Sequence, residues 1–102
     1  MVLILTTVPD AKTASRIARK LVEGKYAACV SVIGNVSSVY RWKKKIETAK
    51  EHLLLVKTSH SRYKKCEKFI CSVHPYAVPE ILSVPVLQGL GKYLAWLGES
   101  LK

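Results

Sequence analysis

A histidine and a glutamate on either side of a proline-bounded turn are the residues of this chain best suited to hold a metal ion. His74 precedes Pro75, and Glu80 follows Pro79. Both prolines restrict the backbone, so they would keep the two side chains in a fixed relation. A neutral imidazole is a good ligand for copper or zinc. The turn is therefore a candidate site for copper or another divalent cation.

The same residues also allow a structural interpretation. His74 could cap a helix end or bond a neighbouring carbonyl group, and Glu80 could pair with a lysine. Two ligands do not close a site, because structural zinc takes about four. Metal binding would need further ligands from a second subunit, from water or from Cys29. His52 and His60 have no partner at a metal-ligand spacing, and we expect both at the surface.

The three cysteines do not indicate a disulfide framework. Cys29, Cys66 and Cys71 form an odd set with no close pair. We therefore predict reduced thiols, mostly buried as small apolar side chains. For Cys29, a buried thiol within a strand is the main alternative to a metal ligand.

Length and composition indicate one domain. The chain has 102 residues, of which 49% are hydrophobic, so residues 1–102 can form a single core. Its net charge of +10 favours anions, nucleic acid or acidic membranes as neighbours, or simply reflects a solvated surface. No apolar run reaches the roughly 18 residues of a membrane helix, and the apolar start lacks the basic segment of a signal peptide. We expect a cytoplasmic protein with no membrane partner.

Apolar spacing in the first half predicts a strand followed by a helix. Residues 2–8 form a short apolar run typical of a buried strand. A helix over 11–23 follows, with Asp10 as its N-cap and Gly24 as a left-handed C-cap.

A long antiparallel hairpin comes next. Residues 26–42 alternate in parts and predict a strand that bends near Gly34–Asn35. The lysines Lys43–Lys45 form a turn, and residues 46–58 return as a strand with apolar residues on both faces.

The last part of the chain predicts a helix, a strand and a final helix. Ser59 or Ser61 can cap the first of these helices, and Pro75 ends it. Residues 79–87 predict a fourth strand, in which Pro85 marks an edge, a bulge or the strand's end. A short terminal helix is marked by Tyr93, Leu94, Leu97 and Leu101.

This order predicts an α+β fold, a ferredoxin-like β-α-β-β-α-β sandwich with an antiparallel sheet and a short C-terminal helix. Two helices would cover one face of the sheet. Tyr40, Trp42 and much of the run 28–33 would remain on other surfaces, which is unfavourable for a monomer. Association with other subunits would remove this exposure.

Four stretches, which span almost the whole chain, carry a family resemblance. They are Thr6–Asp10; Tyr26–Val30; Ser38–Trp42 with Lys45–Glu47 and Val56–Thr58; and His74–Ile81 with Tyr93–Leu97. In this order they resemble the CutA divalent-cation tolerance family. The resemblance implies a ferredoxin-like homotrimer without enzyme activity, linked to tolerance of divalent metal ions, copper above all. Cys29 is the only cysteine that lies in one of these motifs.

The resemblance also implies a cleft between subunits. Counterparts of Trp42, Glu47, Lys57 and Tyr76 lie near this cleft in the family. Lys57 could bind a small anionic ligand there, and Glu47 could neutralise it. The alternative function is therefore a trimeric sensor similar to the PII signalling proteins, whose clefts between subunits hold small ligands. The alternative is an inter-subunit ion pair with aromatic packing, in which Tyr40 and Trp42 hold the trimer together.

Four positions depart from the family pattern. Lys44 replaces a turn glycine, so either the turn differs or this lysine takes a positive φ. Ala77 replaces an acidic residue. Thr6 and Val73 stand where some members carry a cysteine and a further histidine, which weakens the case for a copper site of that kind.

Two other functions that share this topology are disfavoured. RNA-recognition domains stack bases on sheet aromatics, and the strand segment 51–57 has none, so nucleic acid is not an expected partner. Acylphosphatase-like hydrolysis needs an arginine-bearing phosphate loop after the first strand. The loop here ends in Asp10, which would repel phosphate.

Overall fold

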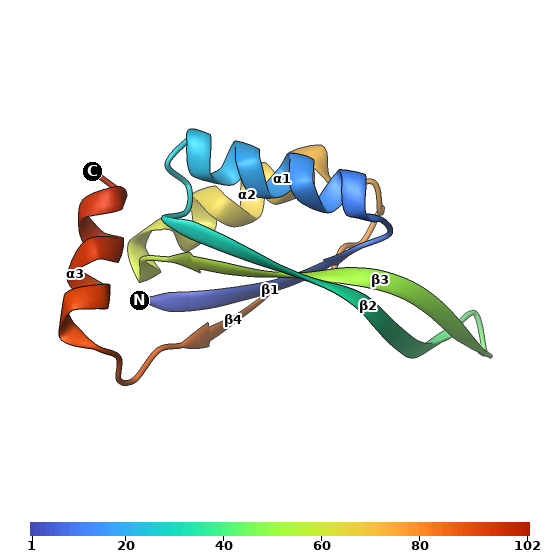
Figure 1. The fold of residues 1–102 in the computed structure, drawn as a ribbon. Helices are drawn as coiled ribbons and strands as arrows, with labels where there is room; N and C mark the ends of the chain where they lie inside the picture. The colour runs from blue at the N-terminus through green and yellow to red at the C-terminus, as the bar shows by residue number, and fades with distance from the viewer.

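Four strands form one antiparallel sheet, and two helices cover one of its faces (Figure 1). The computed structural model describes residues 1–102. Its elements are β1 (Val2–Val8), α1 (Ala11–Glu23), β2 (Cys29–Trp42), β3 (Lys45–Thr58), the 3-10 turn η1 (His60–Arg62), α2 (Tyr63–Val73), β4 (Leu82–Pro85) and α3 (Gly91–Ser100). The strand order is β2-β3-β1-β4 with antiparallel neighbours throughout. The predicted ferredoxin-like class is confirmed.

The core lies between the sheet and the helices. On β1, Val2, Ile4 and Val8 are at most 5% exposed, as the period-2 alternation of a strand requires. Helix α1 contributes Ile17 and Leu21, which belong to the same core cluster as these strand residues. The helix begins at its predicted cap, because the Asp10 carboxylate accepts a hydrogen bond of 2.7 Å from the Thr13 amide. None of the helices is long and apolar enough to cross a membrane.

Two predicted strands are shorter than expected. Strand β2 begins at Cys29 rather than at residue 26, because the amides of Tyr26 and Ala27 both bond the Leu21 carbonyl and continue the end of α1. Strand β4 covers Leu82–Pro85 rather than 79–87. It pairs only with β1, so Pro85 lies at the end of an edge strand, where its missing amide hydrogen is tolerated.

The predicted left-handed cap at Gly24 is wrong. Gly24 has φ −83°, and the positive φ of 58° belongs to Lys25. Glycine is needed at this position for space instead. A Cβ on Gly24 would lie 2.6 Å from the Cε2 atom of Tyr26, whose ring is stacked on Phe69 with centroids 4.5 Å apart.

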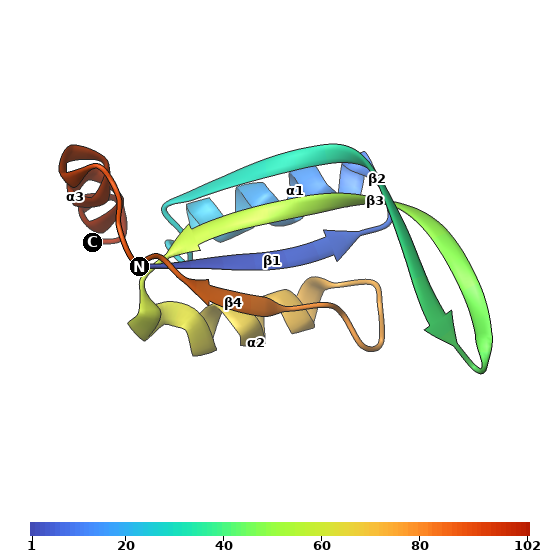
Figure 2. The same ribbon diagram turned by 90° about the horizontal axis from the view of Figure 1, so that it is seen from below.

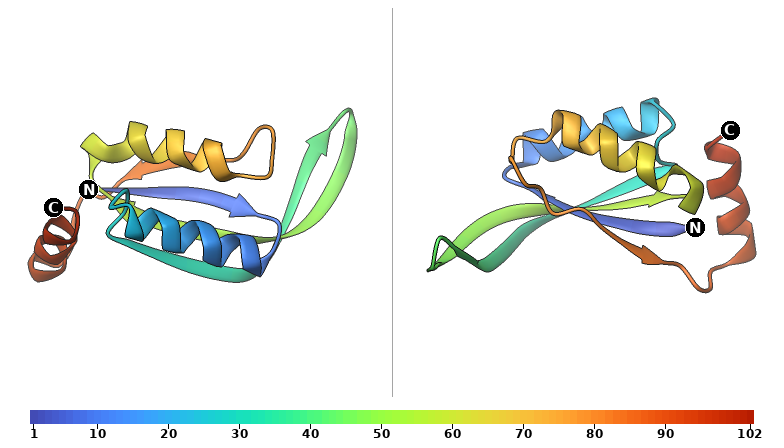
Figure 3. Two further views of the ribbon diagram at one scale, coloured as in Figure 1. Left: turned by 90° about the horizontal axis from the view of Figure 1, so that it is seen from above. Right: turned by 180° about the vertical axis from the view of Figure 1, so that it is seen from behind.

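The hairpin of β2 and β3 extends past the rest of the sheet as an arm (Figures 2 and 3). The register shifts between Ile33 and Val36, next to Asn35 with φ 58°, so the predicted bend is confirmed. At the tip, Lys43 and Lys44 have φ of 48° and 68°. Lys44 therefore takes the positive φ that its glycine counterpart would adopt without strain.

The sheet face away from α1 and α2 is uncovered in the single chain (Figure 1). Its apolar side chains include Leu3, Leu5, Leu53 and Leu55, all half-buried. Helix α3 does not cover this face but packs at one end of the sheet, where Leu97 and Leu101 contact Ala28. Further apolar side chains stand on the arm: Val39, Tyr40, Trp42 and Ile46, which are 45–68% exposed.

We predict that Gly24→Ala destabilises the fold by about 1–3 kcal/mol, because the new methyl group overlaps the immobilised Tyr26 ring. The matched control is Gly98→Ala. It places the same methyl group in open space within α3, so the higher helix propensity of alanine should raise the free energy of unfolding by about 0.5–1 kcal/mol. Urea denaturation measures both free energies of unfolding. Equal stability of Gly24→Ala and wild type would contradict the prediction.

Candidate functional site

The candidate metal turn begins where Pro75 ends α2. His74 takes an extended conformation, with ψ 135°, as expected for a residue before proline. Its backbone amide still caps the helix by bonding the Ile70 carbonyl at 2.9 Å. The side chain, 9% exposed, points back toward the end of β1. His74 is thus buried beside the sheet rather than presented to solvent.

Both ring nitrogens of His74 have hydrogen-bond partners. Nδ1 accepts from the Tyr76 amide at 3.1 Å, so it carries no proton. Nε2 lies 2.8 Å from the Thr7 carbonyl oxygen and therefore donates its hydrogen to it. These bonds hold the imidazole in one neutral tautomer. A metal ion could bind His74 only by replacing one of them, which makes the structural interpretation sufficient to explain this residue.

Glu80 lies on the same turn and is exposed. Its carboxylate has neither the predicted lysine partner nor any other hydrogen bond or ion pair within the chain. It is therefore free to meet a ligand or a second subunit. Of the candidate metal ligands, Glu80 is the only one that is exposed, since His74 is buried and Cys29 half-buried.

Cys29 lies far from this turn. Cys29 on β2 pairs with Lys57 on β3, and Lys57 pairs with Leu3 near the start of β1. His74 instead contacts Thr7, near the end of β1. Four residues of strand separate these positions, or about 13 Å. The Cys29 sulfur also lies 3.7 Å from the Lys57 ammonium nitrogen, and this positive charge disfavours a cation there.

The single chain does not assemble a metal site. No group of three or more His, Cys, Asp or Glu side chains is close enough to hold an ion. Thr6, at the position where some family members carry a cysteine, is completely buried on the helix side of β1. The residues present therefore fit a divalent cation only where a second chain supplies ligands.

The predicted cleft residues are also dispersed within one chain. Trp42 and Glu47 lie on the arm, whereas Lys57 lies ten residues beyond Glu47 on β3, up to about 33 Å away along an extended strand. The Lys57 ammonium donates to the Ser31 hydroxyl at 2.9 Å and has no carboxylate partner. Tyr76 lies on the turn after α2. Only a neighbouring subunit could bring these side chains together.

A pair of a buried glutamate and a half-buried tyrosine, which the sequence did not reveal, holds the candidate turn. The Tyr76 hydroxyl donates to the Glu51 carboxylate at 2.8 Å, and Glu51 is 7% exposed. This contact joins the turn to the base of the arm on β3. A glutamate in a strand gives no sequence signal for burial, because its partner lies 25 residues away along the chain.

Other expectations about single residues have mixed outcomes. All three cysteines are free, as predicted, but only Cys66 is fully buried, and burial raises the pKa of its thiol to about 11. Cys71 is exposed. His60 is exposed as expected, whereas His52 is half-buried beside Gly34, so the surface prediction for His52 is wrong.

Comparison with known proteins identifies the family. Residues 2–100 match the family model described as CutA1 divalent ion tolerance protein. The chain belongs to this family. The CutA1 match agrees with the resemblance in the four motifs and does not favour the PII-like alternative.

Individual CutA proteins are similar over most of the chain. The Protein CutA homolog of Xenopus laevis is 46% identical over 93 residues, which make up 91% of this chain and 62% of that protein. The divalent-cation tolerance protein CutA of Thermus thermophilus is 41% identical, with 95% of this chain and 94% of the relative covered. The crystal structure of CutA from Xylella fastidiosa matches with a TM-score of 0.96 and 40% identity, covering 99% of this chain and 97% of that one. The name of the Thermus thermophilus relative describes tolerance of divalent cations.

We predict that Tyr76→Phe lowers stability at neutral pH by about 1–3 kcal/mol, because Glu51 loses its donor while buried. Burial and the bond to Glu51 raise the pKa of Tyr76 to about 12, against about 10 in an unfolded chain. The native state thus holds this proton more tightly, so the stabilisation is complete below pH 10 and is lost between about pH 10 and 12. Chemical denaturation at pH 7, 10 and 11.5 should show a smaller alkaline loss in the variant.

The control is Tyr93→Phe, because Tyr93 is exposed and its hydroxyl has no hydrogen bond within the chain. It should leave both the neutral stability and the alkaline loss unchanged. A Tyr76→Phe protein as stable as wild type at every pH would show that the contact with Glu51 does not stabilise the turn.

Proposed function

We propose that this protein takes part in tolerance of, or response to, divalent metal ions as a homotrimer without enzyme activity. Its membership of the CutA1 family and the names of its relatives support the link to divalent cations. The observation that carries the assembly is the uncovered apolar surface of the single chain. The helices leave one sheet face uncovered, and Tyr40 and Trp42 on the arm remain about half exposed.

Burial of this surface would stabilise an oligomer. Apolar area removed from water contributes about 25 cal/mol per Å². Tyr40 is 45% exposed and Trp42 is 56% exposed, and such aromatic side chains are the usual anchors of tight interfaces. A closed ring of three chains would let each arm reach a neighbour and would leave no free sheet face.

The same assembly would supply the missing metal ligands. In our proposal, copper or a similar divalent cation binds at Glu80 with ligands from another subunit. His74 joins only by giving up its bond to Tyr76 or Thr7, and Cys29 only by displacing Lys57. We also propose that the same interface brings together a cleft group from neighbouring subunits, which consists of Trp42, Glu47, Lys57 and Tyr76. A cytoplasmic location suits the three free cysteines.

We predict a particle of three times the chain mass in sedimentation velocity at micromolar concentration. The double variant Tyr40→Ser/Trp42→Ser should shift the distribution toward smaller species, because the arm loses its apolar anchors. Val22→Ser is the control, since Val22 is a half-exposed apolar residue on the helix side. A wild-type protein that remains monomeric would refute the trimer.

For the metal site, we predict that Glu80→Gln weakens Cu²⁺ binding in calorimetric titration by about tenfold, because one anionic oxygen ligand is lost. The control is Glu23→Gln, an exposed glutamate at the end of α1. His74→Ala, tested in parallel, should also weaken binding if the imidazole enters the site. Unchanged affinity in Glu80→Gln would remove this carboxylate from the metal site.

A further inference from the structure

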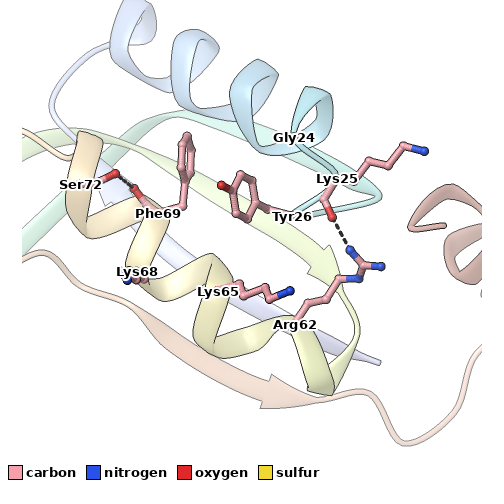
Figure 4. Close-up of a pocket in the computed structure, with 8 residues that line it drawn as sticks. All are labelled: Gly24, Lys25, Tyr26, Arg62, Lys65, Lys68, Phe69 and Ser72. Carbon is pink, nitrogen blue, oxygen red and sulfur yellow. Dashed lines mark hydrogen bonds between the residues drawn. The ribbon is translucent and has the colours of Figure 1, made fainter.

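A basic groove lies between the end of α1 and helix α2, on the helix side of the molecule (Figure 4). It has a volume of about 590 Å³. Its eight lining residues are Gly24, Lys25, Tyr26, Arg62, Lys65, Lys68, Phe69 and Ser72. Four of them are basic and none is acidic. The groove gathers charge from the loop after α1 and from η1 and α2, which lie far apart along the chain.

Two of these cations bond main-chain oxygens. The Arg62 guanidinium donates to the carbonyls of Lys25 at 2.8 Å and Leu101 at 2.6 Å. The Lys25 ammonium donates to a main-chain oxygen of Lys102. The two carbonyl groups orient the Arg62 side chain but do not cancel its charge. A guanidinium has five N–H donors, so Arg62 keeps donors free for a ligand.

The other two cations have no partner within the chain. Lys65 and Lys68 lie three residues apart on α2 and therefore on neighbouring positions of one helix face. Neither makes a hydrogen bond or an ion pair, whereas the adjacent Lys64 pairs with Glu67 at 3.6 Å. Lys65 extends toward the Arg62 side of the groove (Figure 4). Repulsion between these like charges would be relieved by an anion.

The wall of the groove is aromatic and rigid. The rings of Tyr26 and Phe69 stack at an interplanar angle of 17°, and Gly24 lies against the edge of Tyr26. An apolar wall beside charges of one sign concentrates the electric field. Phe69 covers one face of the Tyr26 ring. The lining has four basic side chains against two aromatic ones, so charge rather than base stacking is its main feature, which favours a small phosphate compound over single-stranded nucleic acid.

We propose that this groove binds a small polyanion that carries linked phosphate groups. Guanidinium and ammonium groups together are typical of phosphate recognition, and the groove has the size of ordinary ligand sites. It lies on the side of the sheet opposite the uncovered apolar face, so assembly through that face leaves it open. The proposal is therefore independent of the metal site and of the trimer.

Calorimetric titration of the full chain with sodium triphosphate, in buffer of about 0.15 M salt without divalent cations, tests the proposal. We expect one triphosphate per chain. Lys65→Gln/Lys68→Gln should weaken binding by about tenfold. The control Lys12→Gln/Lys92→Gln makes the same change in net charge outside the groove, so screening should limit its effect to less than about twofold. Thermal denaturation verifies that both variants fold.

Three outcomes would overturn the proposal. The first is no binding of triphosphate by the wild type at millimolar concentration. The second is equal weakening in both double variants, which would show diffuse attraction by the net charge. The third is binding of a single-stranded RNA through Lys65 and Lys68 without binding of triphosphate. ATP should bind no more than tenfold tighter than triphosphate, and a larger preference would contradict recognition through phosphates alone.

Discussion

The structure depends on the pairing of two 14-residue strands, β2 and β3, which are longer than the sheet they belong to. The first part of β2 and the last part of β3 complete the helix-covered sheet beside β1. Beyond Ile33 and His52 the same hairpin continues without a neighbouring strand. One continuous element therefore supplies both the core of the domain and an arm that a single chain cannot cover. The extended shape, 45 Å along its longest axis, follows from this arm.

The candidate metal turn is held by the same part of the sheet. His74 bonds the end of β1 through Thr7, and Tyr76 bonds Glu51 at the base of the arm. The two contacts leave the imidazole occupied and leave Glu80 free. One chain does not assemble a site for a divalent cation, and in our proposal the assembly that would cover the arm also supplies the further ligands.

The two faces of the domain have different chemistry. The uncovered sheet face is mostly apolar, while the helix face carries a recess lined by Lys25, Arg62, Lys65 and Lys68 with no carboxylate among them. An apolar face favours a second protein surface, whereas a basic recess with fixed donors favours a small anion. Part of the net charge of +10 is thus concentrated in one recess, which composition alone does not show.

Local spacing of apolar residues and contiguous motifs were enough to predict the order and type of the elements, the bend near Gly34–Asn35 and the family. They did not predict the partners of the His74 ring, the reason why residue 24 must lack a side chain, or the position of the basic groove. Each of these depends on contacts between segments far apart along the chain, such as His74 with Thr7. Local periodicity carries no information about such contacts, because it records which side of an element is buried and not what lies against it.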